Sequence, residues 1–440
     1  MNILSRVAQA MQTILTTVAN TLGRESGFIR RQRKMSGQTY AQTLVLGWLQ
    51  NPEATLEQLC QTAATLGIAI APQSLDERFS HASSQFMEQL LVAAVEEVIA
   101  TEPVAIPLLR RFNGVYLQDS TILSLPEALK EIWVGCGGSE PEKTASAVKL
   151  QVRLEILKGA LMGPILQHGK DSDRSGFHKS PSLPQGALRL TDLGYFNLSD
   201  LKQLNEDNVY WLTRVKSQCD FYDEKMKRWD LAQFLKSNRG DRVEIPILLG
   251  VKKRLACRLL ACRVSDEVAN ERRRRIREYG RKKGVTPTQK TLFLAGWTLL
   301  VTNVETDRLS LKEALVLMRT RWQMELLFKL WKTYGKVSES RSQKPWRILT
   351  EVSAKLLGMV IQHGIFLTSC WHYPNRSLMK ASATVRTHAS SLAMGWTVGT
   401  MERLVEVLQT IGRCLASGCR LNRRRKHPNT YQLLLTCSSP

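Results

Sequence analysis

The sequence lacks any apolar run long enough to cross a membrane. A transmembrane helix needs roughly 18 consecutive apolar residues. The longest candidate, around 356–370, is interrupted by Gln362 and His363 and predicts a buried helix instead. The N-terminus also lacks the compact apolar core and cleavage site of a signal peptide. We therefore expect a cytoplasmic protein without a membrane partner.

Cysteine is present but is not spaced for a structural metal or a disulfide framework. The chain has nine cysteines. Cys257 with Cys262, and Cys414 with Cys419, lack a matching Cys or His pair at zinc-finger spacing. These cysteines are predicted to be reduced thiols, as is usual in the cytosol.

Acidic residues are too few to balance the basic ones. The chain has 39 acidic and 62 basic residues, a formal net charge of +23. This excess indicates a polyanionic partner, with nucleic acid the first candidate and an anionic membrane surface the second. A length of 440 residues with 43% hydrophobic content allows two or three domains with ample core.

Within this basic chain, one glutamate lies in a segment of helical pattern, RWQMELLFKLWK at 321–332, which has no Gly or Pro. At about 100° per residue, one predicted face carries a carboxylate flanked by cations. This face consists of Arg321, Glu325, Lys329 and Lys332. The opposite, buried face consists of Met324, Leu326, Leu327, Leu330, Trp331 and Tyr334. An ordinary solvated face with i,i+4 ion pairs is the alternative.

Two isolated aspartates lie beside strand-like segments upstream. Asp119 follows the apolar residues 115–117, and a strand bearing this aspartate at its end is predicted. Residues 150–156 alternate between apolar and polar and predict a half-buried strand, followed by another at 160–167. A fourth strand beginning at Leu188 leads into Asp192, which precedes Gly194, Tyr195 and Phe196.

The segments around Asp119, Asp192 and Glu325 resemble those of a known protein family. The C-terminal helix resembles the signature of DDE transposases of bacterial insertion sequences, in the group marked by Y-(2)-R-(3)-E-(6)-K (insertion-sequence family four). Arg321, Glu325 and Lys332 match in type and spacing, whereas Met318 occupies the tyrosine position. The D-x-G-Y-F motif matches at 192–196. The resemblance runs from about Gly114 to Lys332.

The resemblance implies an α/β fold with a ribonuclease-H-like catalytic core. It places an N-terminal helical DNA-end-binding region at 1–105, the catalytic domain at 106–335, and a C-terminal helical region with a basic tail at 336–440. A β-rich insertion at about 217–290 precedes the acidic helix, and strand-like runs at 209–215, 243–249 and 257–264 accord with this. Residues 291–301 are predicted to form the last strand.

The resemblance further implies that Asp119, Asp192 and Glu325 are catalytic and bind two Mg²⁺ ions, with Mn²⁺ as a substitute. Such hard cations prefer oxygen ligands, and two of them can activate the attacking oxygen and stabilise the leaving one. No protein nucleophile is needed, so Ser120, the histidines and the cysteines receive no catalytic role. Asp171, Asp173 and Asp200 are treated as spare carboxylates.

Contacts to DNA are expected at several places. In the resembling family, the residues that match Arg321 and Lys332 hold the transposon-end backbone, and the neighbouring Lys329 is a further expected contact. A tryptophan at the place of Trp297 stacks there on a flipped base, which favours a hairpin intermediate. The basic run in the insertion is expected to contact phosphates through Arg273, Arg274, Arg275, Lys282 and Lys283. Two helical segments predicted at 55–66 and 74–98 suggest a helix-turn-helix unit, which offers Gln73 and Arg78. A basic tail at 413–426 is a further electrostatic contact or a flexible arm.

The leading interpretation is a cut-and-paste transposase that acts on terminal repeats and target DNA as a homodimer, in a bacterial cytoplasm close to the nucleoid. The first helix, 1–22, has an apolar stripe that packs on the body of the protein or on a dimer partner. Two alternatives stay open. One is a catalytically decayed or domesticated DNA-binding protein, and the other is a ribonuclease-H-type nuclease that needs no specific ends.

Overall fold

The computed structural model describes residues 2–31, 35–135, 146–173, 175, 181–216, 218–373, 375–397, 401–422 and 428–437. The chain divides into two compact units. The first combines 1–105, 118–180 and 322–432, and the second combines 106–117, 181–321 and 433–440. Part of the basic tail predicted at 413–426, residues 423–426, lies outside the described residues.

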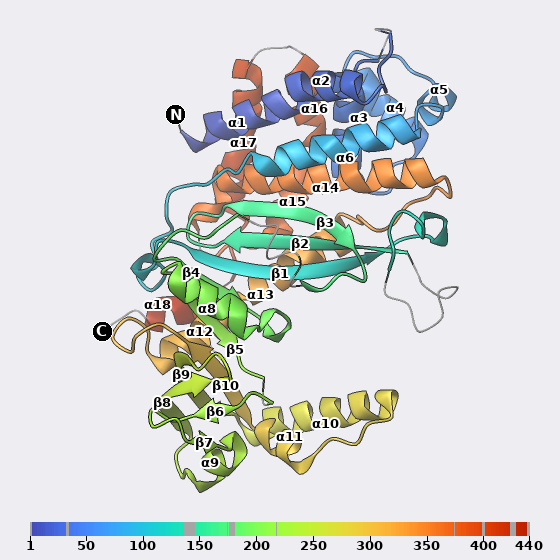
Figure 1. Ribbon diagram of the computed structural model, residues 1–440. Helices are drawn as coiled ribbons and strands as arrows, with labels where there is room; N and C mark the ends of the chain where they lie inside the picture. The colour runs from blue at the N-terminus through green and yellow to red at the C-terminus, as the bar shows by residue number, and fades with distance from the viewer. Residues whose placement is uncertain are drawn as a thin grey trace. The chain divides into compact units, whose positions relative to one another are not determined.

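The first unit consists mainly of helices. Its N-terminal helices are α1 (Ile3–Thr13), the π-helical turn η1 (Ile14–Val18), α2 (Ala19–Glu25), α3 (Gly37–Gln50), α4 (Leu56–Thr65), α5 (Pro72–Asp76) and α6 (His81–Glu96). Its C-terminal part contains α13 (Trp322–Lys329), η6 (Leu330–Tyr334), α14 (Pro345–Leu367), η7 (Cys370–His372), α15 (Leu378–Thr387), α16 (Ala389–Thr397) and α17 (Met401–Gly418). Helices α6 and α14 run side by side (Figure 1).

Capping residues set where several of these helices begin. Ser36, Thr55 and Ser80 form capping boxes at the starts of α3, α4 and α6. The box at Ser80 corrects one prediction, because the single helix expected from residue 74 to 98 is divided into α5 and α6. Our sequence prediction ignored this cap.

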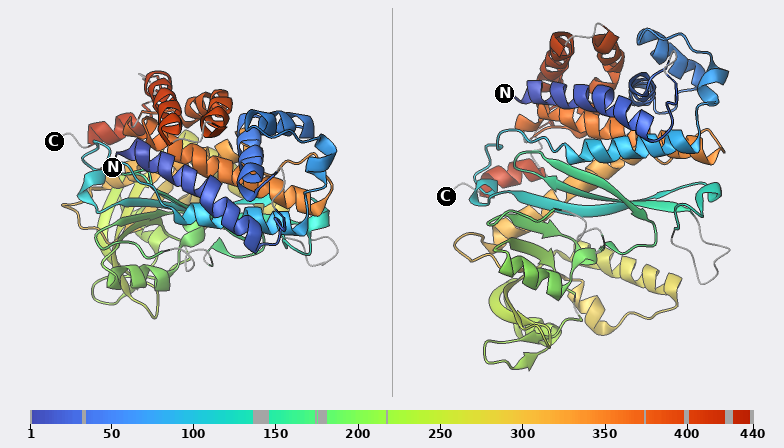
Figure 2. Two further views of the ribbon diagram at one scale, coloured as in Figure 1. Left: turned by 90° about the horizontal axis from the view of Figure 1, so that it is seen from above. Right: turned by 45° about the horizontal axis from the view of Figure 1, so that its top comes forward.

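The apolar stripe of the first helix is used inside the chain. Val7, Met11 and Ile14 are buried, and α1 packs on α14 and α17 (Figure 2). Packing on the body of the protein, one of the two predicted roles, therefore accounts for this stripe. The buried character expected around residues 356–370 is also confirmed, since most of α14 is inaccessible to solvent.

One residue of α14 is a buried histidine. His363 Nε2 lies 2.7 Å from the carbonyl oxygen of Gly159, and its Nδ1 has no partner among the described residues. This pattern is that of a neutral ring that donates through Nε2. Burial, the largest cause, lowers the pKa of His363 from 6.5 to about 4.

We expect His363 to make the first unit sensitive to acid. The unfolded chain binds this proton near pH 6.5 and the folded chain only near pH 4. The stability contribution is therefore complete above pH 6.5 and is lost as the pH falls towards 4, by up to about 3 kcal/mol. His363→Gln, which keeps a donor for Gly159, should flatten urea-unfolding free energies over this interval, whereas exposed His81→Gln should not. Equal slopes in wild type and His363→Gln would contradict this assignment.

Strands β1 (Val115–Ser124), β2 (Ala147–Glu155) and β3 (Leu161–His168) are adjacent in the order β3-β2-β1. Strands β2 and β3 pair antiparallel, and the first residues of β1, up to Leu117, belong to the second unit. A turn at Gly159, with φ of +76°, connects β2 to β3 as predicted. β2 is buried on both faces, which corrects the expected half-buried strand.

In the second unit the sheet continues from the start of β1 in the order β1-β4-β5-β10-β9-β8-β6-β7. The strands are β4 (Leu188–Thr191), β5 (Tyr210–Arg214), β6 (Phe221–Tyr222), β7 (Arg228–Trp229), β8 (Arg242–Leu249), β9 (Leu255–Arg263) and β10 (Trp297–Thr302). The helical elements are η2 (Leu109–Arg111), η5 (Leu193–Tyr195), α8 (Leu198–Glu206), α9 (Leu231–Ser237), α10 (Asp266–Lys283), α11 (Gln289–Leu294) and α12 (Leu311–Thr320). Strands β4 and β5 are parallel, and β10 is antiparallel to both β5 and β9.

The insertion expected before the acidic helix contains the predicted strands β8 and β9 and also the helices α9 and α10, and α11 begins at its end. Residues 291–294 belong to α11 and not to the last strand, which begins only at Trp297. The Thr288 side chain accepts a hydrogen bond from the backbone N–H of Thr291 and so caps α11. None of the helices formed by the described residues is long and apolar enough to span a bilayer.

Candidate active site

Asp119 lies in the middle of β1 and not at its end, which corrects the sequence prediction. Its side chain is half-buried. The backbone N–H of Ser120 donates a 2.9 Å hydrogen bond to Asp119 Oδ1, which restricts the orientation of the carboxylate.

A partly buried polar cluster supports β1 at this point. Ser120 Oγ donates to Asp173 Oδ1 at 2.7 Å, and Lys149 Nζ of β2 donates to the same oxygen at 2.9 Å. Lys149 also donates to the carbonyl of Asp171, and Gln151 Nε2 donates to the carbonyl of Asp173. The segment 171–173 thus covers Lys149 and Gln151 on the polar face of β2, which explains why these two side chains are buried. Sequence reasoning had assigned Ser120 and Asp173 no role.

Asp192 is the residue immediately after β4, as predicted, and precedes the 3₁₀ turn η5. Its Oδ1 atom is buried and has no hydrogen-bond partner among the described residues. Its Oδ2 atom lies 3.7 Å from Nη2 of Arg321, within the same unit. A buried carboxylate oxygen without a donor is unfavourable, and a bound cation would relieve that cost.

The predicted helix at 321–332 is divided into three pieces. Arg321 is the C-cap of α12, residues 322–329 form α13, and Lys332 lies in the π-helical turn η6. The Thr320 hydroxyl donates to the carbonyl of Leu317 at 2.6 Å and so competes with the helical ladder at the first break. The expected single face from Arg321 to Lys332 is therefore not one continuous α-helical face.

The burial pattern of this segment is otherwise close to the prediction. Met324, Leu327, Leu330 and Trp331 are buried and Leu326 is half-buried. Tyr334 is exposed, which corrects its predicted place on the buried face. On the polar side, Glu325 and Lys332 are half-buried and Lys329 is exposed. Partial burial lowers the pKa of Lys332. Met318, at the position of the signature tyrosine, is half-buried in α12.

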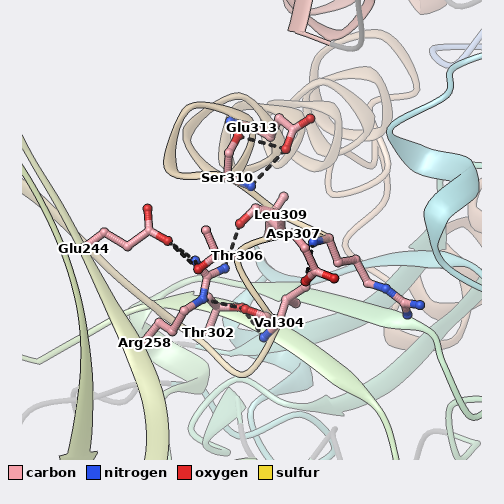
Figure 3. A network of polar contacts seen from close by, with 10 residues as sticks. Glu244, Arg258, Thr302, Val304, Thr306, Asp307, Leu309, Ser310 and Glu313 are labelled. Carbon is pink, nitrogen blue, oxygen red and sulfur yellow. Dashed lines mark hydrogen bonds and ion pairs between the residues drawn. The ribbon is translucent and has the colours of Figure 1, made fainter. Parts of the chain in front are cut away.

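An arginine organises the connection from β10 to α12, and hence the approach to Arg321. Arg258 of β9 donates to the carbonyl of Val304 at 2.6 Å and to that of Leu309 at 2.7 Å (Figure 3). Its Nη1 also binds Thr306 Oγ1 at 2.9 Å and the carboxylate of Glu244. The loop then enters α12 through the Ser310–Glu313 capping box.

The three predicted carboxylates are distributed over both units. Asp119 and Glu325 belong to the first unit, and Asp192 belongs to the second. The described residues contain no group of three or more His, Cys, Asp or Glu side chains gathered as a metal site. The buried Oδ1 of Asp192 and the all-oxygen donor set nevertheless fit a hard divalent cation.

The comparison that decides the family covers more than half of the chain. Residues 110–361 match the family described as the transposase DDE domain. The chain belongs to this transposase family.

Curated relatives agree with this assignment over most of their length. The transposase is 26% identical to the transposase for insertion sequence element IS231F of Bacillus thuringiensis subsp. israelensis, over 85% of this chain and 81% of the relative. It is 25% identical to the IS231E transposase of B. thuringiensis subsp. finitimus, over 91% of this chain and 90% of that relative. The IS1151 transposase of Clostridium perfringens is 25% identical to this chain, over 80% of this chain and 78% of that relative.

The transposase is accordingly an enzyme that cleaves DNA and transfers its strands, as the leading interpretation of the sequence held. DNA is its substrate, and transposases with this domain generally use divalent metal ions. The matched range includes all three predicted carboxylates.

The tryptophan expected to stack on a base is buried by other side chains of the same chain. Trp297 is the first residue of β10 and only 4% exposed. The guanidinium of Arg263 lies 4.9 Å from the centre of its ring, and Arg263 is also paired with Asp241 at 3.0 Å. Stacking of a base on Trp297 would thus require Arg263 to move. In contrast, Trp322 next to Arg321 is 56% exposed, which sequence reasoning did not anticipate.

The residues offered by the N-terminal region lie on and after a very short helix. Gln73 is exposed on the five-residue α5, where its Nε2 atom lies 3.3 Å from Glu77 Oε1. Arg78 follows this helix and is half-buried. Asp76 binds Lys344 and Arg347, so that α5 is attached to the start of α14.

Proposed function

We propose that this transposase performs cut-and-paste transposition of an insertion sequence of the Y-R-E-K group, insertion-sequence family four. The observation that carries the proposal is the combination of the DDE-domain match with Asp192, directly after β4, paired to the signature residue Arg321. The match of Arg321, Glu325 and Lys332 to the group's spacing supports the finer assignment.

A ribonuclease-H-like core is the fold we propose for the catalytic part. Its support is the strand order β3-β2-β1-β4-β5, with β2 and β3 antiparallel and β4 and β5 parallel. Within the proposed catalytic domain, 106–335, the segment 217–290 is an insertion. The flanking regions 1–105 and 336–440 are helical and would bind the transposon ends and contribute to a homodimer in the synaptic complex.

Asp119, Asp192 and Glu325 would together hold two Mg²⁺ ions, for which Mn²⁺ can substitute. Metal ions held there would supply Lewis-acid chemistry for an attacking and a leaving phosphodiester oxygen. The chain's own contribution is to orient the carboxylates. The N–H of Ser120 holds Asp119, and Arg321 lies beside Asp192. Arg321, Lys329 and Lys332 supply positive charge for the DNA backbone.

Cleavage is proposed to pass through a hairpin at the transposon end, with Trp297 exposed by movement of Arg263 and stacked on a displaced base. Base stacking on an aromatic side chain is worth roughly 1–3 kcal/mol, which offsets part of the cost of displacing the base from the duplex.

The test is cleavage of a supercoiled plasmid that carries the ends of the candidate element. Wild-type protein in Mg²⁺ should cut at the ends and leave hairpin-capped fragments, and removal of Mg²⁺ with a chelator should stop the reaction. A plasmid with scrambled ends is the control. Binding of the ends without cleavage would favour a decayed DNA-binding protein. Equal cutting of scrambled ends would favour a nuclease that does not read ends.

The cluster beneath Asp119 leads to a separate prediction. Asp173→Asn should weaken the contacts to Ser120 and Lys149 and so loosen Asp119. Loss of a supporting contact of a metal ligand typically costs about 10–100-fold in metal affinity or activity. We expect a rise in the Mn²⁺ concentration needed for half-maximal cleavage, matched by weaker Mn²⁺ binding in a direct titration. The control Asp207→Asn, an exposed change in the second unit, should alter neither the Mn²⁺ requirement of cleavage nor Mn²⁺ binding. Unchanged Mn²⁺ binding in Asp173→Asn would refute the supporting role of Asp173.

A further inference from the structure

Helix α10 is the most basic helix of the second unit and has a defined end. Its C-cap, Gly284, has φ of +65°, in the left-handed region that favours glycine. Gly280 permits a close return of the chain, because a Cβ there would lie 2.4 Å from the carbonyl oxygen of Val285. In Figure 1, α10 (yellow) extends away from β8, β9 and β10 of its own unit, and the following segment returns along it to α11.

The arginines in the first half of α10 are used inside the protein. Arg272 donates to the carbonyl of Trp297 at 3.0 Å and lies 3.2 Å from Thr298 Oγ1. Arg273 donates to the carbonyl of Leu292 at 3.1 Å and to Asn270. Burial lowers the pKa of Arg272. These two side chains attach α10 to β10 and α11, so Arg273 is not available as the free phosphate contact that the sequence indicated.

The next two arginines are neutralised by acids of the same helix. Glu271 pairs with Arg274 at 2.7 Å and with Arg275 at 2.8 Å. Glu278 lies 3.8 Å from Arg274. Exposed pairs of this kind are individually weak, yet they cancel part of the local positive charge. The middle of α10 therefore presents less net charge than its sequence indicates.

The last part of α10 has a different character. After Glu278 the helix contains no acid, and its final turn carries Arg281, Lys282 and Lys283. These three side chains and Arg277 are exposed and form no ion pair with the described residues. Tyr279, between them, is 66% exposed. We call Arg277, Tyr279, Arg281, Lys282 and Lys283 the α10 tip.

We propose that the α10 tip is a duplex-DNA contact in which the four cations neutralise phosphates and Tyr279 packs against a sugar or base. The inference rests on the proposed DNA contact of the basic run. It keeps Lys282 and Lys283 of that run and replaces the arginines at 273–275 with Arg277, Tyr279 and Arg281. Charge complementarity identifies the partner, since four unpaired cations beside an exposed aromatic ring match a polyanion with flat bases. The helix cap and the tight return at Gly280 hold the tip in a fixed conformation before DNA arrives.

The test measures binding of the full-length transposase to two duplexes of equal length, one with the terminal repeat and one unrelated, in a buffer with chelator. Binding then does not depend on cleavage, so a failure of catalysis and a failure of this inference can be told apart. For Lys282→Gln/Lys283→Gln, the slope of log affinity against log salt should fall by about 1.8, since each neutralised phosphate contributes about 0.9. The matched control is Arg274→Gln/Arg275→Gln, which should change the slope much less.

The aromatic contribution has its own readout. Tyr279→Leu should weaken binding by about 10-fold with an unchanged salt slope, because stacking involves no ion release. Tyr279→Phe should retain most of the affinity. Loss on both duplexes would identify a contact to any DNA, including target DNA, and loss on the repeat alone would identify the transposon end. Unchanged salt slope in the lysine variant, or equal effects in the arginine control, would overturn the proposal.

Discussion

Glu325→Gln is expected to lower cleavage at the transposon ends by about 10³-fold or more, because metal stabilisation of the transition state is worth several kcal/mol. The amide keeps the size of the side chain but removes the charge that attracts a divalent cation. Glu325 is half-buried on α13, whose opposite residues Met324 and Leu327 are buried. The substitution should therefore leave the fold and the affinity for DNA unchanged. Single-turnover cleavage of end-bearing DNA is the measurement.

A matched control separates the loss of a ligand from the loss of local charge. Gln323→Glu adds a carboxylate two residues away on a half-buried position of the same helix, and combined with Glu325→Gln it restores the net charge. It should not restore cleavage, because a metal ligand must also be correctly placed. If the Glu325→Gln protein cleaves within about 10-fold of wild type, the assignment of Glu325 as a metal ligand fails, since that loss corresponds to only about 1.4 kcal/mol.

Arg258→Ala is expected to destabilise the second unit by about 2–4 kcal/mol, because two carbonyl oxygens of buried residues lose their donor and each buried acceptor left unsatisfied costs about 1–3 kcal/mol. The Arg258 side chain is only 12% exposed and binds two carbonyl oxygens in addition to Thr306 and Glu244 (Figure 3). Its removal leaves the carbonyls of Val304 and Leu309 without this donor and loosens the loop that leads into α12. Urea unfolding, followed by tryptophan fluorescence, is the measurement.

Two controls identify the origin of that loss. Arg242→Ala, on the exposed start of β8, should cost less than about 0.5 kcal/mol, as is usual for surface substitutions. Glu244→Gln should cost less than Arg258→Ala, because the arginine keeps its bonds to both carbonyls. A loss in Glu244→Gln as large as that in Arg258→Ala would show that the ion pair, and not the carbonyl contacts, stabilises the loop.

Local patterns in the sequence predicted much of the fold. Alternation and turn residues predicted β3, β8 and β9 within a few residues, and Asp192 stands directly after β4 as expected. The predictions failed where a capping side chain outweighed the pattern. The apolar pattern predicted one helix where the cap at Ser80 starts a second one. The cap at Thr288 starts α11 where a strand was expected. A short side-chain cap is a weaker signal in sequence than a hydrophobic period, although it decides where a helix begins.

The candidate active-site residues were also predictable only in part. Their identities and their positions on single elements could be inferred, because the resemblance depends on type and spacing along the chain. Their surroundings could not. Asp173 reaches Ser120 and Lys149 only because segment 171–173 folds over β2, and Arg263 covers Trp297 only because β9 pairs with β10. Neither contact has a periodic signal in the sequence.

By itself, the sequence determined the basic charge, the apolar stripes of the helices, the strand-like segments beside the aspartates and the spacing from Arg321 to Lys332, since each is a local or additive property of the residues. Only the tertiary structure decided which cations are available to DNA. Arg272 to Arg275 and the residues of the α10 tip look alike in sequence, yet the first group is attached to β10, α11 and neighbouring acids while the tip is exposed. Partners distant along the chain, and not composition, determine whether a charge is used inside the protein or offered to a ligand.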